Sequence, residues 1–181
     1  MTADIRLGLI GDNILASQSP RLHRLAGSQN GVRVTYDRLI PARMQMPFDA
    51  LFAHVAESGY RAVNVTYPYK ERAAAKVTVD DPLVRAIGAV NTLVRTEAGY
   101  KGYNTDGAGL KRAFAEAGIR TEGEHCLLIG AGGAAKAAAY VLAKGGAADI
   151  HILNRNETRA RELADCINTL TGSGLAEALP L

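Results

Sequence analysis

Cysteine is scarce in this sequence of 181 residues, which contains only Cys126 and Cys166. Two cysteines at this spacing exclude a framework of several disulfides and a Cys-x-x-Cys metal site. The four histidines show neither the His-Glu-x-x-His nor the His-x-His spacing of zinc ligands, so we expect no metal site. Cys126 lies in an apolar run, residues 126–129, and is expected to behave as a small buried hydrophobe. The scarcity of cysteine favours the reducing cytoplasm as the location of the protein.

Long apolar runs and a strong charge imbalance are also missing. No segment reaches the length that spans a membrane, and residues 1–11 lack the basic and apolar segments of a secretory signal. The 21 basic residues are scattered and exceed the 18 acidic residues only enough to give a net charge of +3. We therefore expect no membrane and no nucleic-acid partner. A mild positive charge suits an anionic substrate or cofactor.

Strand-like and helix-like segments alternate along the first part of the chain, a pattern typical of α/β folds. Strands are predicted over residues 5–10, 32–40 and 62–66, and residues 89–95 and 100–104 are predicted to pair as a hairpin. Helices are predicted after Ser19 and Pro20, over residues 48–58, and from Lys70. Ser19 is expected to cap the first helix, with Pro20 at its first position.

The second part begins with a connecting helix over residues 106–117. Strands are predicted over residues 125–129 and 149–153, and helices over residues 134–144 and 157–170. The first of these strands is apolar throughout, which is typical of a buried parallel strand. The tail, residues 171–181, is small and polar and is expected to fray. We therefore predict two α/β domains: a substrate-binding and catalytic domain over residues 1–104 and a Rossmann-type domain over residues 105–181.

A dinucleotide fingerprint follows the predicted strand at residues 125–129. Gly130-Ala131-Gly132-Gly133-Ala134-Ala135 fits the pattern G-x-G-x-x-A, with a strand before it and a helix after it. Gly130 would permit the tight turn, Gly132 would let the backbone approach a pyrophosphate, and Ala135 would allow close packing of helix on strand. The start of the helix would then offer amide donors to the phosphates. The alternative is an ordinary glycine-rich turn in an α/β protein.

The end of the second strand of this unit selects the cofactor. NAD enzymes usually carry Asp or Glu there, whereas this chain has Asn154, Arg155 and Asn156, with Arg159 one turn later. A guanidinium can bind the 2′-phosphate of NADP through paired charged hydrogen bonds. A merely solvated arginine at a helix start is the alternative, but the helix dipole disfavours it. We therefore predict NADP as the cofactor.

Polar motifs lie at the ends of the predicted strands of the first domain, at Ser17–Pro20, Asn64–Lys70 and Ala89–Thr92, and at Asn104–Gly107 before the connecting helix. Open α/β sheets bind ligands beyond the carboxyl ends of their strands. Six motifs follow one another along the chain: Ser-x-Ser-Pro, Asn-Val-Thr-x-Pro-x-Lys, Gly-Ala-Val-Asn-Thr, Asn-Thr-Asp-x-x-Gly, Gly-Ala-Gly-Gly-Ala and Asn-Arg. Together and in this order they resemble the shikimate and quinate dehydrogenase family. The resemblance covers residues 5 to about 164.

This resemblance implies a two-domain enzyme of aromatic amino-acid biosynthesis that reduces 3-dehydroshikimate to shikimate with NADPH, as a monomer or homodimer. It also implies the residue roles. Lys70 and Asp106 would form the catalytic pair, Ser17 and Ser19 would bind the substrate carboxylate, and Asn64, Thr66, Asn91 and Asp106 would hold the ring hydroxyls. The chemistry agrees, because hydride addition to a carbonyl requires a proton from a nearby acid, which a desolvated lysine can supply.

The sequence departs from the family pattern at two places, and several alternative interpretations of its function and residues stay open. Asn156 stands where the family often has threonine, and residues 11–16 read Gly-Asp-Asn-Ile-Leu-Ala where biosynthetic members often have G-x-P-I-x-H. Quinate/shikimate or aminoshikimate dehydrogenase is therefore the close alternative, and a fragment that binds substrate without turnover is another. Taken singly, Lys70 could be a surface residue at a helix start, and Asp106 and Ser19 could be helix caps.

The dinucleotide domain is expected to be incomplete. A doubly wound domain has strand order 3-2-1-4-5-6, and only two of these strands are predicted here. The open apolar edge of residues 125–129 would favour self-association. The nicotinamide half of the cofactor would be poorly held, and the resemblance implies that family members add helices and a glutamine to the pocket. We therefore expect measurable shikimate binding, weak NADP binding and little turnover.

Overall fold

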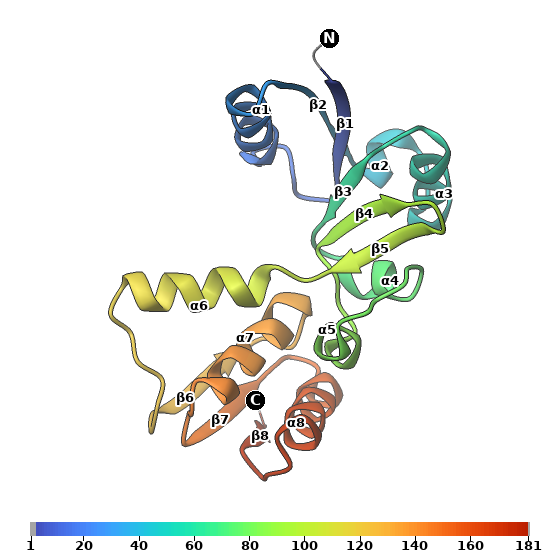
Figure 1. Ribbon diagram of the computed structural model, residues 1–181. Helices are drawn as coiled ribbons and strands as arrows, with labels where there is room; N and C mark the ends of the chain where they lie inside the picture. The colour runs from blue at the N-terminus through green and yellow to red at the C-terminus, as the bar shows by residue number, and fades with distance from the viewer. Residues whose placement is uncertain (1–2, 181) are drawn as a thin grey trace. The chain divides into compact units, whose positions relative to one another are not determined.

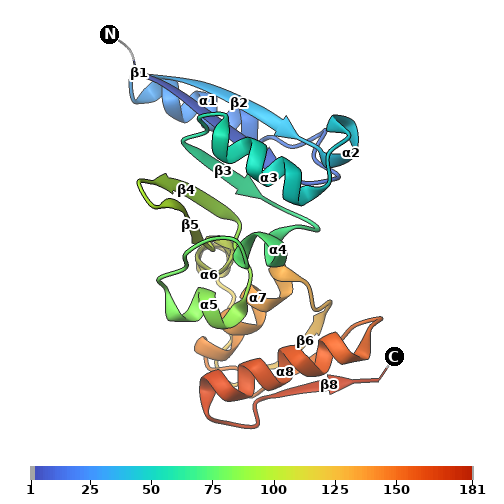
Figure 2. The ribbon, with the colours of Figure 1, turned by 90° about the vertical axis from the view of Figure 1, so that its right-hand side faces the viewer.

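The structure is a computed structural model that describes residues 3–180, and it divides into two compact units (Figures 1 and 2). The first unit comprises the described residues up to Asp81 together with Ala89–Tyr103. The second comprises Pro82–Gly88 and the described residues from Asn104 onward. Residues 82–88 thus group with the second unit, although they lie before the boundary proposed between residues 104 and 105. In the part of the chain that is described, no helix has the length and apolar character needed to cross a membrane.

A five-stranded mixed sheet with the order β2-β1-β3-β4-β5 forms the first unit. The parallel strands are β1 (Ala3–Ile10), β2 (Val32–Leu39) and β3 (Ala62–Val65), with β1 in the middle. The predicted hairpin is present as β4 (Thr92–Thr96) and β5 (Gly99–Tyr103), which pair antiparallel, and β4 also pairs antiparallel with β3. The carboxyl ends of β1 and β3 therefore lie side by side, as a ligand site at strand ends requires.

The helices of the first unit are α1 (Ser19–Gln29), α2 (Pro41–Met44), α3 (Phe48–Glu57) and α4 (Lys70–Ala74). The helix pattern over residues 48–58 is confirmed, and α3 buries Phe48, Leu51 and Val55. The capping role expected of Ser19 is wrong, because α1 already includes Ser19 and its N-cap is Gln18. Instead, the backbone N–H of Ser19 donates to the hydroxyl of Ser17 at 3.2 Å.

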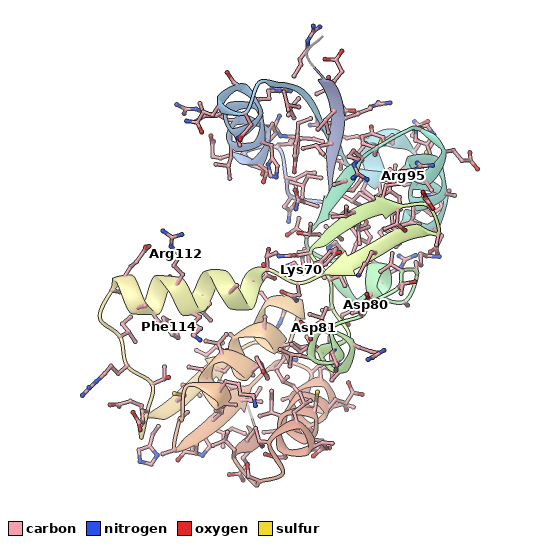
Figure 3. All side chains as sticks on the ribbon, in the orientation of Figure 1. Lys70, Asp80, Asp81, Arg95, Arg112 and Phe114 are labelled. Atoms are coloured by element: carbon pink, nitrogen blue, oxygen red, sulfur yellow. The ribbon has the colours of Figure 1, made fainter. Side chains whose placement is uncertain are left out.

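The second unit contains a parallel sheet with the order β6-β7-β8. Its strands are β6 (His125–Ile129), β7 (Asp149–Leu153) and β8 (Ala176–Leu179), and its helices are α5 (Pro82–Ile87), α6 (Asp106–Glu116), α7 (Gly133–Lys144) and α8 (Glu157–Thr171). Its core is formed by small and branched side chains of α7, α8 and β7, with Phe114 of α6 (Figure 3) packed against it. Strands β8, β7 and β6 correspond to strands 3, 2 and 1 of a Rossmann-type domain, and 3-2-1 is the strand order of its first half.

Two expectations for the second unit are wrong. The segment expected to fray forms β8, because the amide of Asn168 in α8 holds the backbone N–H and carbonyl of Ala176 with two hydrogen bonds of 2.8 Å. The unit therefore has three strands rather than the two that were predicted. β6 is not fully buried: Leu127 is 59% and Ile129 is 76% exposed, and Cys126 is half-buried.

Candidate active site

The loop after β1 presents two hydroxyls next to one another. The hydroxyl of Ser17 donates to that of Ser19 at 3.1 Å, and both side chains are half-buried. The guanidinium of Arg38 on β2 donates to the carbonyl of Ser17 at 2.9 Å, which brings a cation to this loop. Adjacent hydroxyl donors beside an arginine suit a carboxylate, because hydrogen bonds to ionised acceptors are strong.

A chain of hydrogen bonds continues from these serines across the sheet. The hydroxyl of Tyr36 lies beside the Ser19 side chain and donates to Asn64 Oδ1 at 2.9 Å. Asn64 Nδ2 donates to Thr92 Oγ1 at 3.2 Å, and Thr92 Oγ1 donates to Asn91 Oδ1 at 2.9 Å. Burial is the main cause that raises the pKa of Tyr36 to about 12, while the hydrogen bond from Ser19 and the charge of Arg38 oppose this shift. The phenol therefore stays neutral and remains a donor.

The segment after β3 is tied to the loop after β1. The N–H of Thr66 donates to the carbonyl of Ile10 at 2.9 Å, and the Tyr69 hydroxyl donates to Asp12 Oδ1 at 2.7 Å. Lys70 (labelled in Figure 3) opens α4 and is half-buried, and its carbonyl accepts the N–H of Val90 at 3.1 Å. These bonds hold the backbone of Thr66 and Lys70 close to the ends of the parallel strands.

The structure thus pairs Ser17 with Ser19 and links Asn64 to Asn91 through Thr92, and Tyr36 lies between the two groups in the first unit. Asp106 belongs to the second unit, where its N–H donates to Asn104 Oδ1 at 3.0 Å. Asp106 is not the helix cap, since the N-cap of α6 is Thr105. Lys70 belongs to the first unit.

Sequence reasoning missed Tyr36, Arg38 and Thr92. Strand alternation places Val32, Val34 and Tyr36 on one face of β2, but it does not indicate that the phenol reaches a partner on β3. Thr92 lies in a recognised motif, yet its role as a link between two asparagines depends on the pairing of β3 with β4. Contacts between strands of this kind have no local sequence signal.

The glycine-rich turn of the second unit lies where β6 ends. Gly130 has φ +113°, a conformation that favours glycine, and its N–H donates to the carbonyl of Leu153 at 2.8 Å. Gly132 is the N-cap of α7 and has an extended backbone, with φ −86° and ψ −177°. A Cβ added there would meet no atom within 4 Å. Packing within the unit therefore gives no reason for glycine at 132. Close approach of a ligand to the backbone is a physical reason that remains.

The predicted cofactor residues at the end of β7 lie beside this turn, because Ile129 and Leu153 are paired in register. Asn154 Nδ2 donates to the carbonyl of Asn156 at 2.8 Å, and Asn156 Oδ1 caps α8 by accepting the N–H of Arg159 at 3.2 Å. Asn156 thus performs the capping role that a threonine could perform. Arg155 lies between these asparagines with an exposed side chain. A parallel β-α-β-α-β unit with this turn defines the class of Rossmann-type dinucleotide-binding proteins.

Comparison with known proteins identifies the family. A family model described as "Shikimate dehydrogenase substrate binding domain" matches residues 9–93, and one described as "Shikimate / quinate 5-dehydrogenase" matches residues 112–177. The chain belongs to the shikimate dehydrogenase family. It is 39% identical over 172 residues to the shikimate dehydrogenase (NADP(+)) of Moorella thermoacetica, and 42% identical over 170 residues to that of Halobacterium salinarum. These alignments cover 93% and 92% of this chain but only 56% and 62% of the relatives, so the chain spans less than two thirds of their length.

Solved structures show the same fold. Quinate dehydrogenase from Corynebacterium glutamicum, in complex with NAD, matches with a TM-score of 0.86 and 29% identity over 97% of this chain and 64% of that protein. Shikimate 5-dehydrogenase from Thermus thermophilus, in complex with NADP(H) and shikimate, matches with a TM-score of 0.79 and 31% identity. That match covers 97% of this chain and 63% of the solved protein. Both comparisons support a substrate domain followed by a Rossmann-type unit.

Proposed function

We propose that the protein is an NADP-dependent shikimate dehydrogenase, which reduces 3-dehydroshikimate to shikimate with NADPH. The observation that carries this proposal is a row of polar side chains in the first unit, in which Ser17 bonds to Ser19, and Tyr36 beside them bonds to Asn64, which bonds to Thr92. A row of hydroxyls and amides suits a substrate that carries a carboxylate and several ring hydroxyls, because each polar group of such a ring needs a partner when it is buried. The relatives from Moorella thermoacetica and Halobacterium salinarum are shikimate dehydrogenases (NADP(+)).

In this proposal, Ser17 and Ser19 bind the substrate carboxylate, and Asn64, Thr66, Asn91 and Asp106 bind the ring hydroxyls. Lys70 donates the proton that the new alcohol oxygen requires, and Asp106 positions the ammonium. NADPH supplies the hydride when it is bound. The half-buried position of Lys70 at the start of α4 supports its role, because it places the side chain in the segment that follows the end of β3.

The proposed cofactor site consists of the glycine-rich turn and the end of β7. Residues 130–135 would hold the pyrophosphate against the amides at the start of α7. Asn154, Arg155 and Arg159 would surround the adenosine 2′-phosphate. No carboxylate stands at residues 154–156, so nothing there repels a phosphate. The bonds of Asn154 and Asn156 to their own loop support a fixed presentation of Arg155.

Quinate oxidation with NAD is the second candidate. The likeness to quinate dehydrogenase in complex with NAD, with a TM-score of 0.86, favours it. The loop of residues 11–16, which departs from the common biosynthetic pattern, is compatible with a different ring substituent. We further propose a cytoplasmic monomer or homodimer, a location supported by the free thiols Cys126 and Cys166.

One set of measurements distinguishes these candidates. Calorimetry would compare the binding of shikimate and quinate, and steady-state assays would compare NADP and NAD with each substrate. Tighter binding of shikimate together with faster reduction of NADP would support the proposal. Preference for quinate and NAD would replace it with the second candidate. Absence of binding by both ring acids would exclude both functions.

A further inference from the structure

Tyr36 is a buried phenol that connects two parts of the proposed substrate site. Its side chain is only 3% exposed and packs with Leu9, Ile14 and Ile40. A phenylalanine would fill the same apolar space, so packing does not explain the hydroxyl. A buried hydroxyl is costly unless it has a partner, and this one donates to Asn64 Oδ1 and lies beside Ser19.

The Tyr36 ring reaches across a whole strand to make this link. Tyr36 lies on β2 opposite Leu7 of β1, whereas Asn64 lies on β3 opposite Leu9 of β1. Because β1 separates β2 from β3, the two residues are two strands apart, roughly 10 Å in the direction of hydrogen bonding. A short side chain on β2 could not span this gap. The ring of His23, with its centroid 4.8 Å from that of Tyr36, supports it from α1.

The orientation of the Asn64 amide follows from its neighbours. Asn64 Nδ2 lies 3.4 Å from the backbone carbonyl of Asn91, which can only accept a hydrogen bond. The amide nitrogen must therefore face β4, and Oδ1 must face Tyr36. The phenol supplies the donor that this orientation needs, and the chain of donors continues through Thr92 to Asn91 Oδ1.

We propose that Tyr36 is a positioning residue, which orients Asn64 toward the ring hydroxyls and keeps Ser19 in register with it for the carboxylate. This inference rests on the proposed function, because the substrate roles of Ser19 and Asn64 are part of it. Tyr36 acts through these two side chains and does not itself need to touch the substrate. Tyr36 thereby sets the distance between the carboxylate site at Ser19 and the ring-hydroxyl site at Asn64.

The test compares Tyr36→Phe with Tyr100→Phe in the same chain. Tyr100 is a suitable control because its buried hydroxyl donates to the Tyr60 carbonyl at 2.8 Å, so both changes remove a phenolic hydroxyl that donates one hydrogen bond. We expect both variants to melt at lower temperature. Only Tyr36→Phe should weaken shikimate binding in calorimetry, by about tenfold, the factor that corresponds to one neutral hydrogen bond. Equal affinity of Tyr36→Phe and the unmodified chain, or an equal loss in Tyr100→Phe, would overturn the inference.

A second readout requires no ligand. The side-chain amide signals of Asn64 can be assigned in nuclear magnetic resonance spectra by their loss in Asn64→Asp. They should shift in Tyr36→Phe and stay in place in Tyr100→Phe. If the unmodified chain binds no shikimate, the proposed function fails, and the amide signals alone decide whether Tyr36 orients Asn64. Unchanged signals in Tyr36→Phe would reject the positioning role.

Discussion

The hydroxyl of Ser17 lies 3.1 Å from that of Ser19 and also accepts the backbone N–H of Ser19 at 3.2 Å. Ser17 therefore supports the start of α1, whereas the Ser19 side chain lies beside Tyr36. We therefore expect both serines to contribute to binding, and Ser17 to contribute to stability as well.

We expect Ser17→Ala and Ser19→Ala each to weaken shikimate binding about tenfold, because each removes one hydroxyl donor to a carboxylate. Ser17→Ala should also lower the free energy of unfolding by about 1 kcal/mol more than Ser19→Ala, since it removes an interaction of capping type. Calorimetry and urea unfolding measure the two effects. Ser28→Ala, at an exposed position of α1, is the control. Normal binding by both variants would remove the serines from the site.

Lys70→Ala should lower kcat at least ~100-fold, the usual effect of losing general acid–base help. Shikimate should still bind within a few-fold, because the serines and asparagines provide most of the proposed contacts. The measurement is steady-state kinetics in a preparation whose unmodified chain turns over. Lys76→Ala is a matched control, because Lys76 follows the same helix and is paired with Asp49 at 2.8 Å. Near-normal turnover of Lys70→Ala would exclude Lys70 as the proton donor.

Arg155→Ala should weaken binding of NADP by about tenfold or more and leave binding of NAD nearly unchanged, because only NADP carries the 2′-phosphate. Fluorescence titration with each cofactor measures the ratio. Arg161→Ala is the control, since Arg161 lies on the helix that follows and is paired with Glu157 at 2.8 Å. A parallel loss for both cofactors in Arg155→Ala would mean that Arg155 supports the fold. A preference of the unmodified chain for NAD would contradict the choice of cofactor.

Local patterns predicted most of the regular elements here, and the reason is physical. β6 and β7 begin and end at the predicted residues because apolar runs bounded by glycine or asparagine have few other conformations in an α/β unit. The tail was mispredicted because β8 depends on pairing with β7 and on Asn168, whose amide bonds to the backbone of Ala176. That contact joins residues eight positions apart on different elements and leaves no periodic pattern.

The residues of the candidate site likewise divide into those that sequence patterns indicate and those that they do not. Ser17, Asn64 and Asn91 are recognisable because they lie in motifs at strand ends. Tyr36 is not, because its function depends on the order of β2, β1 and β3 in the sheet. Sequence patterns indicate which residues reach an end of a sheet. They do not indicate which strands become neighbours, and that order decides which side chains are hydrogen-bonded.

Alkaline pH should destabilise the first unit through its buried and half-buried phenols. Burial is the largest cause that raises the pKa of Tyr36, Tyr60 and Tyr69 from 10.0 to about 12. A raised pKa in the folded state means that the neutral form is favoured there, so this stabilisation is complete below pH 10 and is lost as the pH rises toward 12. Urea unfolding at pH values across this window measures the decline. Tyr36→Phe should show a shallower decline than the unmodified chain, whereas identical slopes would contradict the shift.

Gly27 of α1 is required by packing, and Gly109 of α6 is not. A Cβ at Gly27 would lie 2.4 Å from Val34 Cγ2 and 2.9 Å from the carbonyl oxygen of Val32, both on β2. At Gly109 an added Cβ would meet no atom within 4 Å. Both glycines are inside helices, where alanine is intrinsically better by about 1 kcal/mol.

We therefore expect opposite signs for the two substitutions. Gly27→Ala should lower the free energy of unfolding by about 1 to 3 kcal/mol, the usual cost of overpacking, because the clash with a backbone carbonyl cannot be relieved by a rotamer change. Gly109→Ala should raise it by up to about 1 kcal/mol. Urea unfolding of both variants measures the difference, and each serves as the helix-propensity control for the other. If Gly27→Ala were as stable as Gly109→Ala, α1 would be packed less closely on β2 than the structure shows.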